Sequence, residues 1–351
     1  MLNQNILNIV ISTFLLSFLT TYLMSFFFLK NFPIGSDSKK GIQKIHTTKA
    51  IRLGGIVLVT SINVIFFIFD IYEKWIIKFY LFISPILIIA VLEDINKNIS
   101  VKLRLIVIVV SSFLLIINSG EIVNDVDIYW VNNFLSIFYI GLFFTVIGYT
   151  ATINALNFID GLNGLSSGLA LIILTSMYFL TKNSYIPEID TFILINIFAI
   201  LGFYLINVFT GKVFLGDVGS YYLGVLIASL GVKIHFYSEI SAWIIFIFIL
   251  YPATELIFSF FRRLLKKKSP FKPDNLHLHS ILFQILNSRI KKIPTLYINS
   301  FSGFIMVIFG SVPIILISIF NYENFGKIIT LATFILFYFC SLFTLNYYNK
   351  K

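Results

Sequence analysis

Long apolar stretches alternate with short polar ones along most of the chain. A helix that crosses a lipid bilayer needs roughly 20 mostly apolar residues, so the pattern predicts an all-α, polytopic membrane protein with about 11 transmembrane helices. We expect 1–351 to form a single transmembrane domain, because the longest polar stretch, 262–297, is too short to fold alone. The predicted spans are approximately 6–29, 53–72, 75–92, 103–118, 134–152, 164–181, 190–209, 218–236, 241–261, 298–320 and 327–347.

The composition supports this prediction. Hydrophobic residues make up 58% of the chain and charged residues only 12%, whereas soluble domains are about a quarter charged. The chain has one cysteine, Cys340, inside the last predicted span. An intramolecular disulfide and a cysteine metal site are therefore both excluded.

Basic residues gather on alternate loops. If the N-terminus is outside, the inside segments hold 21 of the 26 lysines and arginines, as the positive-inside rule requires. We therefore predict that the N-terminus is outside and the C-terminus cytosolic. The same rule accounts for most of the net charge of +10, so no nucleic-acid partner is needed, and the lipid bilayer is the expected partner. The five remaining basic residues are Lys74, Lys78, Lys182, Lys233 and Lys327.

Polar clusters lie at the inside ends of the predicted spans, where polar residues are often functional. The first cluster is the adjacent pair Glu93 and Asp94, followed by Lys102 and Arg104. Magnesium is bound by one or two carboxylates together with substrate phosphates. The pair could therefore hold Mg²⁺ or orient a phosphate; the alternative is an acid pair that simply ends a span.

The second cluster contains amides and a carboxylate at helical spacing. Asn154, Asn157 and Asp160 recur at i, i+3 and i+6, which keeps them roughly on one helical face. Asn163 follows, between two glycines that permit backbone turns. Such a segment can present polar groups to a nucleotide; the alternative is an ordinary polar loop.

The third cluster is Gly216-Asp217-Val218-Gly219-Ser220, directly before a predicted span. Its glycines let the backbone approach a phosphate or a metal, and Ser220 lies near a helix N-terminus, which favours anions. Taken alone, such a run is also a common turn.

The fourth cluster is the histidine pair His277 and His279, which follows several basic residues. A His-x-His pair could bind a transition metal, but no other histidine or cysteine lies near it in the sequence. Binding of a pyrophosphate, with the basic residues supplying a positive field, fits better.

In this order, the four clusters resemble those of the polyprenyl-phosphate N-acetylhexosamine-1-phosphate transferase family, also called glycosyltransferase family 4. The family includes UDP-GlcNAc:undecaprenyl-phosphate GlcNAc-1-phosphate transferases and the phospho-MurNAc-pentapeptide translocase. The resemblance runs from Gln43-Lys44-Ile45-His46 and Arg52-Leu53-Gly54-Gly55 to His279. It covers nearly the whole chain.

The resemblance implies a role for each cluster. Glu93 and Asp94 match an aspartate pair, Asp160 falls in a motif tied to the nucleotide and catalysis, and Asp217 matches an aspartate assigned to Mg²⁺. Substrate or nucleotide binding is implied for the remaining positions, which are Lys44, His46, Asn154, Asn157, Asn163, Ser220, His277 and His279.

Three positions depart from the family pattern. Glu93 replaces an aspartate, Asn163 replaces a second aspartate found in many members, and Ser280 replaces a histidine. Glutamate keeps the charge but moves it by a methylene, whereas Asn163 loses it. These departures affect the identity of the sugar more than the class of reaction.

The reaction implied by the resemblance is attack by a polyprenyl phosphate, undecaprenyl phosphate, on the β-phosphorus of a UDP-sugar. It yields a polyprenyl-diphospho-sugar and UMP, with GlcNAc the first expected sugar and Mg²⁺, or Mn²⁺ in its place, as the cofactor. The expected location is the bacterial inner membrane, with the active site on the cytosolic face where nucleotide sugars occur. A homodimer is one arrangement open to such a protein.

The role of Asp94 has three alternatives: general base, covalent nucleophile, or part of the metal site. A phosphate monoester has a second pKa near 6, so the acceptor is already largely dianionic at neutral pH. We therefore predict direct single displacement, with Asp94 mainly a positioning group.

Two other classes of protein remain as alternatives. A transporter is the first; transporters place their sites near the bilayer midplane on broken helices, and Glu255 is deep enough in a span to act as a relay. A structural membrane subunit is the second, although it would give no reason for four polar clusters on one side.

Overall fold

The computed structural model describes residues 4–31, 50–96, 99–182, 187–238, 240–269, 276–320 and 324–350. These ranges form fourteen α-helices and no strand, apart from one parallel bridge between Ile51 and Val213, so the prediction of an all-α fold is confirmed. The helices are α1 (Gln4–Asn31), α2 (Gly54–Ile68), α3 (Lys74–Asn96), α4 (Val101–Ser119), α5 (Tyr129–Leu135), α6 (Phe138–Ile159), α7 (Leu165–Thr181), α8 (Pro187–Thr210), α9 (Gly216–Tyr237), α10 (Ala242–Phe248), α11 (Leu250–Leu265), α12 (Leu278–Arg289), α13 (Thr295–Ile319) and α14 (Asn324–Lys350).

Eight helices of the described ranges are long and apolar enough to cross a membrane, which makes this a multi-pass membrane protein. The pair α10 and α11 is bent by 75° and adds a ninth crossing if it forms one span. Each predicted stretch coincides with a helix or with this pair. However, α2 has 15 residues and α7 has 17, fewer than the roughly 20 of a full span. Helix length alone therefore gives eight or nine crossings within the described ranges, fewer than the predicted number of about 11.

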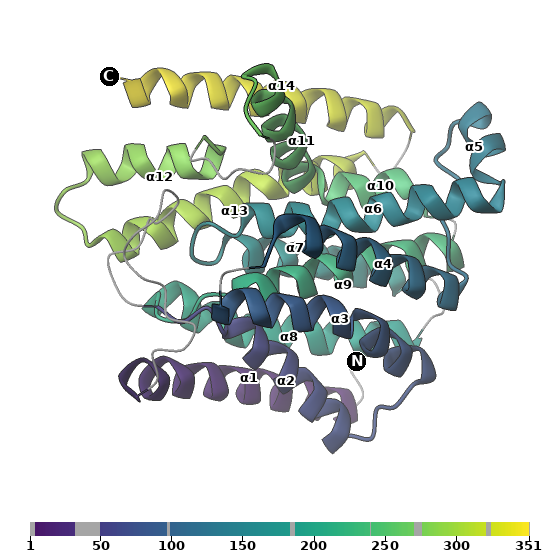
Figure 1. Ribbon diagram of the computed structural model, residues 1–351, viewed down its shortest axis with the longest axis horizontal. Coiled ribbons are helices and arrows are strands. Elements are labelled where there is room, and N and C mark those ends of the chain that lie inside the picture. The colour runs from purple at the N-terminus through teal and green to yellow at the C-terminus, as the bar shows by residue number, and fades with distance from the viewer. Residues whose placement is uncertain are drawn as a thin grey trace.

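The helices pack around α9, which is buried on every side along most of its length. It contacts α2, α3, α6, α7 and α10, while α1 packs against α8 at one side of the bundle (Figure 1). A helix that is apolar all round belongs in the interior of a bundle. By contrast, α1 and α14 expose many large apolar side chains, as expected for helices that face lipid.

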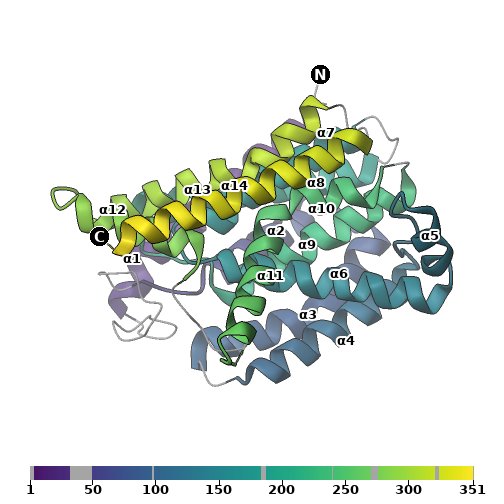
Figure 2. The same cartoon turned by 90° about the horizontal axis from the view of Figure 1, so that it is seen from above.

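The two ends of the bundle differ. In Figures 1 and 2, α12 lies at one end and α5 at the other, with α11 running across the direction of its neighbours. The polar segments that follow α3 and α6 and precede α9 all lie at the α12 end, because their residues contact one another there. Two elements fall between the predicted spans: α12 lies within the polar stretch 262–297, and the last turns of α6 lie between the predicted spans 134–152 and 164–181.

A close glycine contact sets the position of α2 against α9. The backbone N–H of Gly55 donates to the Leu215 carbonyl at 2.8 Å, and that of Gly54 to the Phe214 carbonyl at 3.0 Å. A Cβ on Gly55 would lie 2.1 Å from the backbone nitrogen of Gly219. Small residues let helices approach closely within a membrane, and here they bring the segment before α2 beside the start of α9.

Candidate active site

Asp94 lies in the last turns of α3 and is fully buried. Its two carboxylate oxygens accept hydrogen bonds from the backbone N–H groups of Asp217 and Val218, each at 3.1 Å. These N–H groups belong to the first turn of α9, where helical donors have no partner within the helix and a negative charge is favourable. Asp94 therefore caps α9 and joins it to α3.

Gly216 makes this cap sterically possible. Its φ angle is +71°, and a Cβ at this position would lie 2.1 Å from the Arg52 carbonyl oxygen and 2.6 Å from Asp94 Oδ2. Only glycine adopts this conformation without strain. The glycine of the third sequence cluster thus lets Asp94 and Arg52 reach the start of α9.

The Asp217 carboxylate is the point where four helices meet. Its Oδ2 accepts from Arg104 Nη1 of α4 at 2.7 Å, and its Oδ1 accepts from Asn157 Nδ2 of α6 at 3.2 Å. Arg104 Nη1 also lies 3.7 Å from Glu93 Oε1 of α3. The structure therefore brings residues of the first, second and third clusters together.

Asn157 and Asn154 have different surroundings although they are one turn apart. Asn157 Nδ2 donates to Ser220 Oγ at 2.8 Å, so this amide joins α6 to α9. Asn154 Nδ2 instead donates to the Thr150 carbonyl within its own helix at 2.7 Å. Of the two predicted nucleotide-binding amides, the structure brings only Asn157 to the carboxylates.

Asp160 ends α6 and adds a further carboxylate. The residue has intermediate exposure, but its carboxyl group is enclosed by protein, and this burial raises the pKa of Asp160 to about 8. The nearby carboxylates of Asp217 and Asp94 raise it further, while the Arg52 guanidinium lowers it. Asp160 therefore lies within electrostatic reach of both other acids.

Asn163 takes a buried structural position. Its backbone N–H donates to Asn299 Oδ1 at 2.7 Å, and its Nδ2 donates to Ser300 Oγ at 3.3 Å. Both partners belong to α13. The side chain thus anchors the segment between α6 and α7 to α13, and the structure does not bring it to the Asp217 carboxylate.

The histidine cluster is held by an acid of α11. Glu255 is fully buried; its Oε1 accepts from the Leu278 backbone N–H at 2.9 Å and its Oε2 lies 3.2 Å from His277 Nδ1. The His277 and His279 rings are stacked with centroids 5.3 Å apart. His279 Nε2 faces Gly161, since a Cβ on that glycine would lie 2.7 Å from it. The fourth cluster therefore packs against Gly161, the residue that follows Asp160.

Three residues that are not among the predicted site residues belong to this group. Arg104 and Arg52 supply its positive charge, and Glu255 fixes the histidines. The sequence could have identified each of them as a paired residue, because a charged residue at the start or in the interior of an apolar stretch is costly unless it has a partner. Lys44 and His46, predicted to bind substrate, lie outside the described residues.

Comparison with known proteins gives a family match over the part of the chain that holds these carboxylates. A family model described as glycosyl transferase family 4 matches residues 76–235, a range that contains Asp94, Asp160 and Asp217.

Curated relatives extend the match. The undecaprenyl-phosphate α-N-acetylglucosaminyl 1-phosphate transferase of Thermotoga maritima is 30% identical over 203 residues, which are 58% of this chain and 60% of that protein. The probable undecaprenyl-phosphate N-acetylglucosaminyl 1-phosphate transferase of Bacillus subtilis is 25% identical over 306 residues, 86% of this chain and 84% of that protein. The Escherichia coli K12 α-N-acetylglucosaminyl 1-phosphate transferase is 28% identical over 286 residues, 78% and 77% of the two chains. The chain is therefore similar to glycosyl transferase family 4 over residues 76–235, and to these transferases over a larger part of its length.

Proposed function

We propose that this protein transfers a sugar 1-phosphate, GlcNAc-1-phosphate foremost, from a UDP-sugar to undecaprenyl phosphate and releases UMP. The names of its relatives support both the acceptor and the sugar. The observation that carries the proposal is the convergence on Asp217: residues of α3, α4 and α6 meet its carboxylate or its backbone at the start of α9. The product is the lipid-linked first sugar of a cell-surface glycan.

The proposed step exchanges one phosphoanhydride for another. An oxygen of the acceptor phosphate forms a bond to the β-phosphorus of the donor, and the bond from that phosphorus to the bridging oxygen breaks, so that UMP leaves with the electron pair. Phosphoryl transfer depends mainly on positioning and charge neutralisation. In this chain Arg104 and Arg52 would neutralise charge, while Asn157 and Ser220 would orient polar groups of the donor.

Asp94 acts as a positioning residue in this proposal. Both of its oxygens already accept backbone hydrogen bonds, and the side chain is fully buried. Its carboxylate is thus committed to holding Asp217. The acceptor phosphate needs no base because it is largely dianionic at neutral pH, so we retain direct single displacement.

Mg²⁺ is the proposed cofactor, with Mn²⁺ as a substitute. Hard divalent cations prefer oxygen donors, and magnesium often takes only one or two carboxylates besides substrate phosphates. The site offers the Asp217 carboxylate beside the Ser220 hydroxyl and the Asp160 carboxyl, a donor set that fits this preference. Asp217 would hold the ion, and when bound the ion offsets the charge of the diphosphate.

We place the active site at the cytosolic face of the bacterial inner membrane. Two described basic residues lie where the carboxylates meet: Arg104 pairs with Asp217, and Arg263 lies over the Phe158 ring near the end of α6, as the positive-inside rule favours. With α2, α7 and the pair α10 and α11 counted as crossings, the chain would cross eleven times, N-terminus outside and C-terminus cytosolic. The histidine pair would then lie on the cytosolic side, where donor phosphates occur.

Glu255, the residue that favoured a transporter, has a structural role in this protein. Glu255 accepts a backbone hydrogen bond from Leu278 and pairs with His277, so it supports the histidine cluster and is not free to act as a relay.

Release of UMP tests the proposal. Purified protein would receive undecaprenyl phosphate, Mg²⁺ and a panel of UDP-sugars, with Asp217→Asn as the site variant and Lys182→Gln, an exposed residue outside the site, as the control. We expect release that requires both lipid phosphate and metal, is lost in Asp217→Asn and is unchanged in Lys182→Gln. Absence of UMP with every donor would overturn the proposal.

A further inference from the structure

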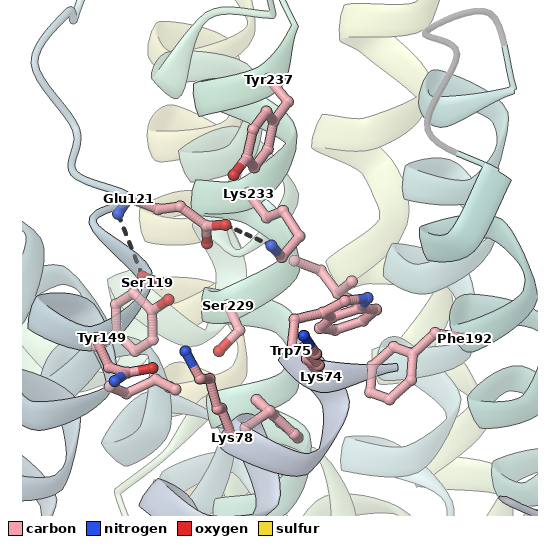
Figure 3. A pocket seen from close by; sticks show the side chains of 14 residues that line it. Lys74, Trp75, Lys78, Ser119, Glu121, Tyr149, Phe192, Ser229, Lys233 and Tyr237 are labelled. Carbon is pink, nitrogen blue, oxygen red and sulfur yellow. Dashed lines mark hydrogen bonds and ion pairs between the residues drawn. The ribbon is translucent and has the colours of Figure 1, made fainter. Parts of the chain in front are cut away.

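Figure 3 shows the residues that line a cavity of about 250 Å³. The cavity lies where α3 begins and α9 ends, away from the candidate active site at the end of α3 and the start of α9. It is lined by residues of α3, α4, α6, α8 and α9 and by Glu121, in the segment that follows α4. Lys74, the first residue of α3, lines this cavity, whereas Asp94 lies 20 residues further along the same helix. At about 1.5 Å per residue the two sites are roughly 30 Å apart, so the cavity is a separate feature.

One lysine of the cavity is already neutralised. Lys233 of α9 forms an ion pair with Glu121, the one acid among the lining residues. Its Nζ also lies 5.0 Å from the centroid of the Trp75 ring and 5.1 Å from that of Tyr237. Figure 3 shows Lys233, Glu121 and both rings grouped on the same side of the cavity. This group forms a charge-balanced, aromatic wall.

The other two lysines are not neutralised. Lys74 and Lys78 are exposed residues one turn apart on α3, and within the described ranges neither side-chain ammonium group forms a hydrogen bond or an ion pair. Side chains at i and i+4 lie about 5–6 Å apart at their Cβ atoms, which lets two ammonium groups contact one anion. They are also two of the five basic residues that the positive-inside rule leaves unexplained. The cavity lining therefore holds three lysines and a single acid, Glu121, which pairs with Lys233.

An apolar surface continues from these lysines along the same face of α3. Ile77 is 53% exposed and Leu81 is 63% exposed. Together with Lys74 and Lys78 they follow an i, i+3, i+4, i+7 spacing, so all four share one side of the helix. A positive cavity that leads onto a lipid-facing apolar surface matches an amphiphile better than a soluble anion. The aromatic rings of the wall are typical of the level at which headgroups lie.

We propose that this cavity binds an anionic phospholipid. Its phosphate would lie between Lys74 and Lys78, its headgroup would contact the wall formed by Trp75 and Lys233, and its acyl chains would run along Ile77 and Leu81. Lysines bind phosphate as point charges, and each lysine near an anionic lipid surface strengthens binding about fivefold. The lipid is not a substrate here, and its binding does not depend on the reaction proposed at the other end of the bundle.

Lipid binding to the purified full-length protein provides the test. Native mass spectrometry would measure bound phosphatidylglycerol and, as the zwitterionic comparison, phosphatidylcholine with the same acyl chains; a thermal melt would measure the stabilisation each lipid gives. The variant is Lys74→Gln with Lys78→Gln, and the matched control is Lys182→Gln, an exposed lysine outside the cavity. Glycerol 3-phosphate is the soluble probe that carries the same phosphate without acyl chains.

We expect wild type to prefer phosphatidylglycerol, the double variant to bind it at least about tenfold more weakly, and Lys182→Gln to bind like wild type. Each single variant should lose about fivefold, which keeps the test available if the double variant does not fold. Equal weakening by Lys182→Gln, or no preference for phosphatidylglycerol in wild type, would overturn the site. If glycerol 3-phosphate stabilised the protein equally, the acyl chains would not contribute, and the ligand would be a soluble phosphate and not a lipid. None of these experiments measures UMP release. A negative result for lipid binding would therefore leave the proposed reaction untouched, and the two proposals can fail separately.

Discussion

Asp94 accepts a hydrogen bond at 3.1 Å from the backbone N–H of Asp217, a residue 123 positions away in the chain. Both Asp94 oxygens accept backbone N–H bonds at the start of α9, so the carboxylate serves as a helix cap, which fits the positioning role that we propose. The bond places Asp217 at the first turn of α9 with its own side chain free to meet Arg104 and Asn157. In the proposed reaction, Asp94 would therefore position the start of α9 and Asp217 would contact the substrate.

Replacement of Asp94 should separate these two roles. Asp94→Ala leaves two buried N–H groups without an acceptor, so we expect a loss of about 2–5 kcal/mol in the free energy of unfolding and loss of UMP release. Asp94→Asn keeps one acceptor oxygen and should retain more stability than Asp94→Ala. Intact-protein mass spectrometry after incubation with UDP-sugar alone should show no added phosphosugar on wild type. A phosphoaspartyl adduct under those conditions would refute single displacement.

Gly161→Ala should disturb the contact between the second and fourth clusters. Its Cβ would lie 2.7 Å from His279 Nε2, and the buried His279 ring, stacked on His277, has little room to move. We expect UMP release to fall by at least about tenfold, since a displacement of about 1 Å near reacting groups can cost a hundredfold. Gly148→Ala is the matched control, because a Cβ there meets nothing within 4 Å. Equal activity of the two variants would show that the contact does not matter.

The helices were predictable because apolar stretches long enough for spans leave few alternatives in a membrane. All eleven predicted stretches coincide with helices or a bent pair, and the clustering of acids at their ends located Asp94, Asp160 and Asp217. The pairings between them were not predictable. The cap formed by Asp94 depends on how α3 and α9 pack, which no local pattern encodes.

Two residues show where reasoning from sequence fell short. Arg104 follows Lys102 at the start of a predicted span and looks like one more positive-inside anchor, yet its guanidinium lies 2.7 Å from Asp217 Oδ2. Asn163 continues the pattern of polar residues, yet it is buried against α13. Spacing along one helix indicates which residues share a face; it does not indicate which neighbour that face meets.

Asn163→Asp tests the departure from the family pattern at this position. The Asn163 Oδ1 atom is buried and has no hydrogen-bond partner in the described ranges, so a carboxylate here would be buried with one oxygen unpaired. Burial of a poorly paired charge is costly. We therefore expect Asn163→Asp to lower the melting temperature by several degrees, roughly what 1–3 kcal/mol produces, without improving UMP release. Higher activity in this variant would instead indicate a direct nucleotide contact.

The stability of the protein should fall in acid through His279. Burial, followed by repulsion from His277, lowers the pKa of His279 from 6.5 to about 3, although Glu255 acts in the opposite direction. A depressed pKa in the folded state means that the unfolded chain binds the proton more readily. The stabilisation is therefore complete above pH 6.5 and is lost progressively as the pH falls toward 3. Thermal melts between pH 7.5 and pH 4 should show a falling melting temperature in wild type and a shallower fall in His279→Gln. If both proteins follow the same curve, His279 is not the group that is protonated on unfolding.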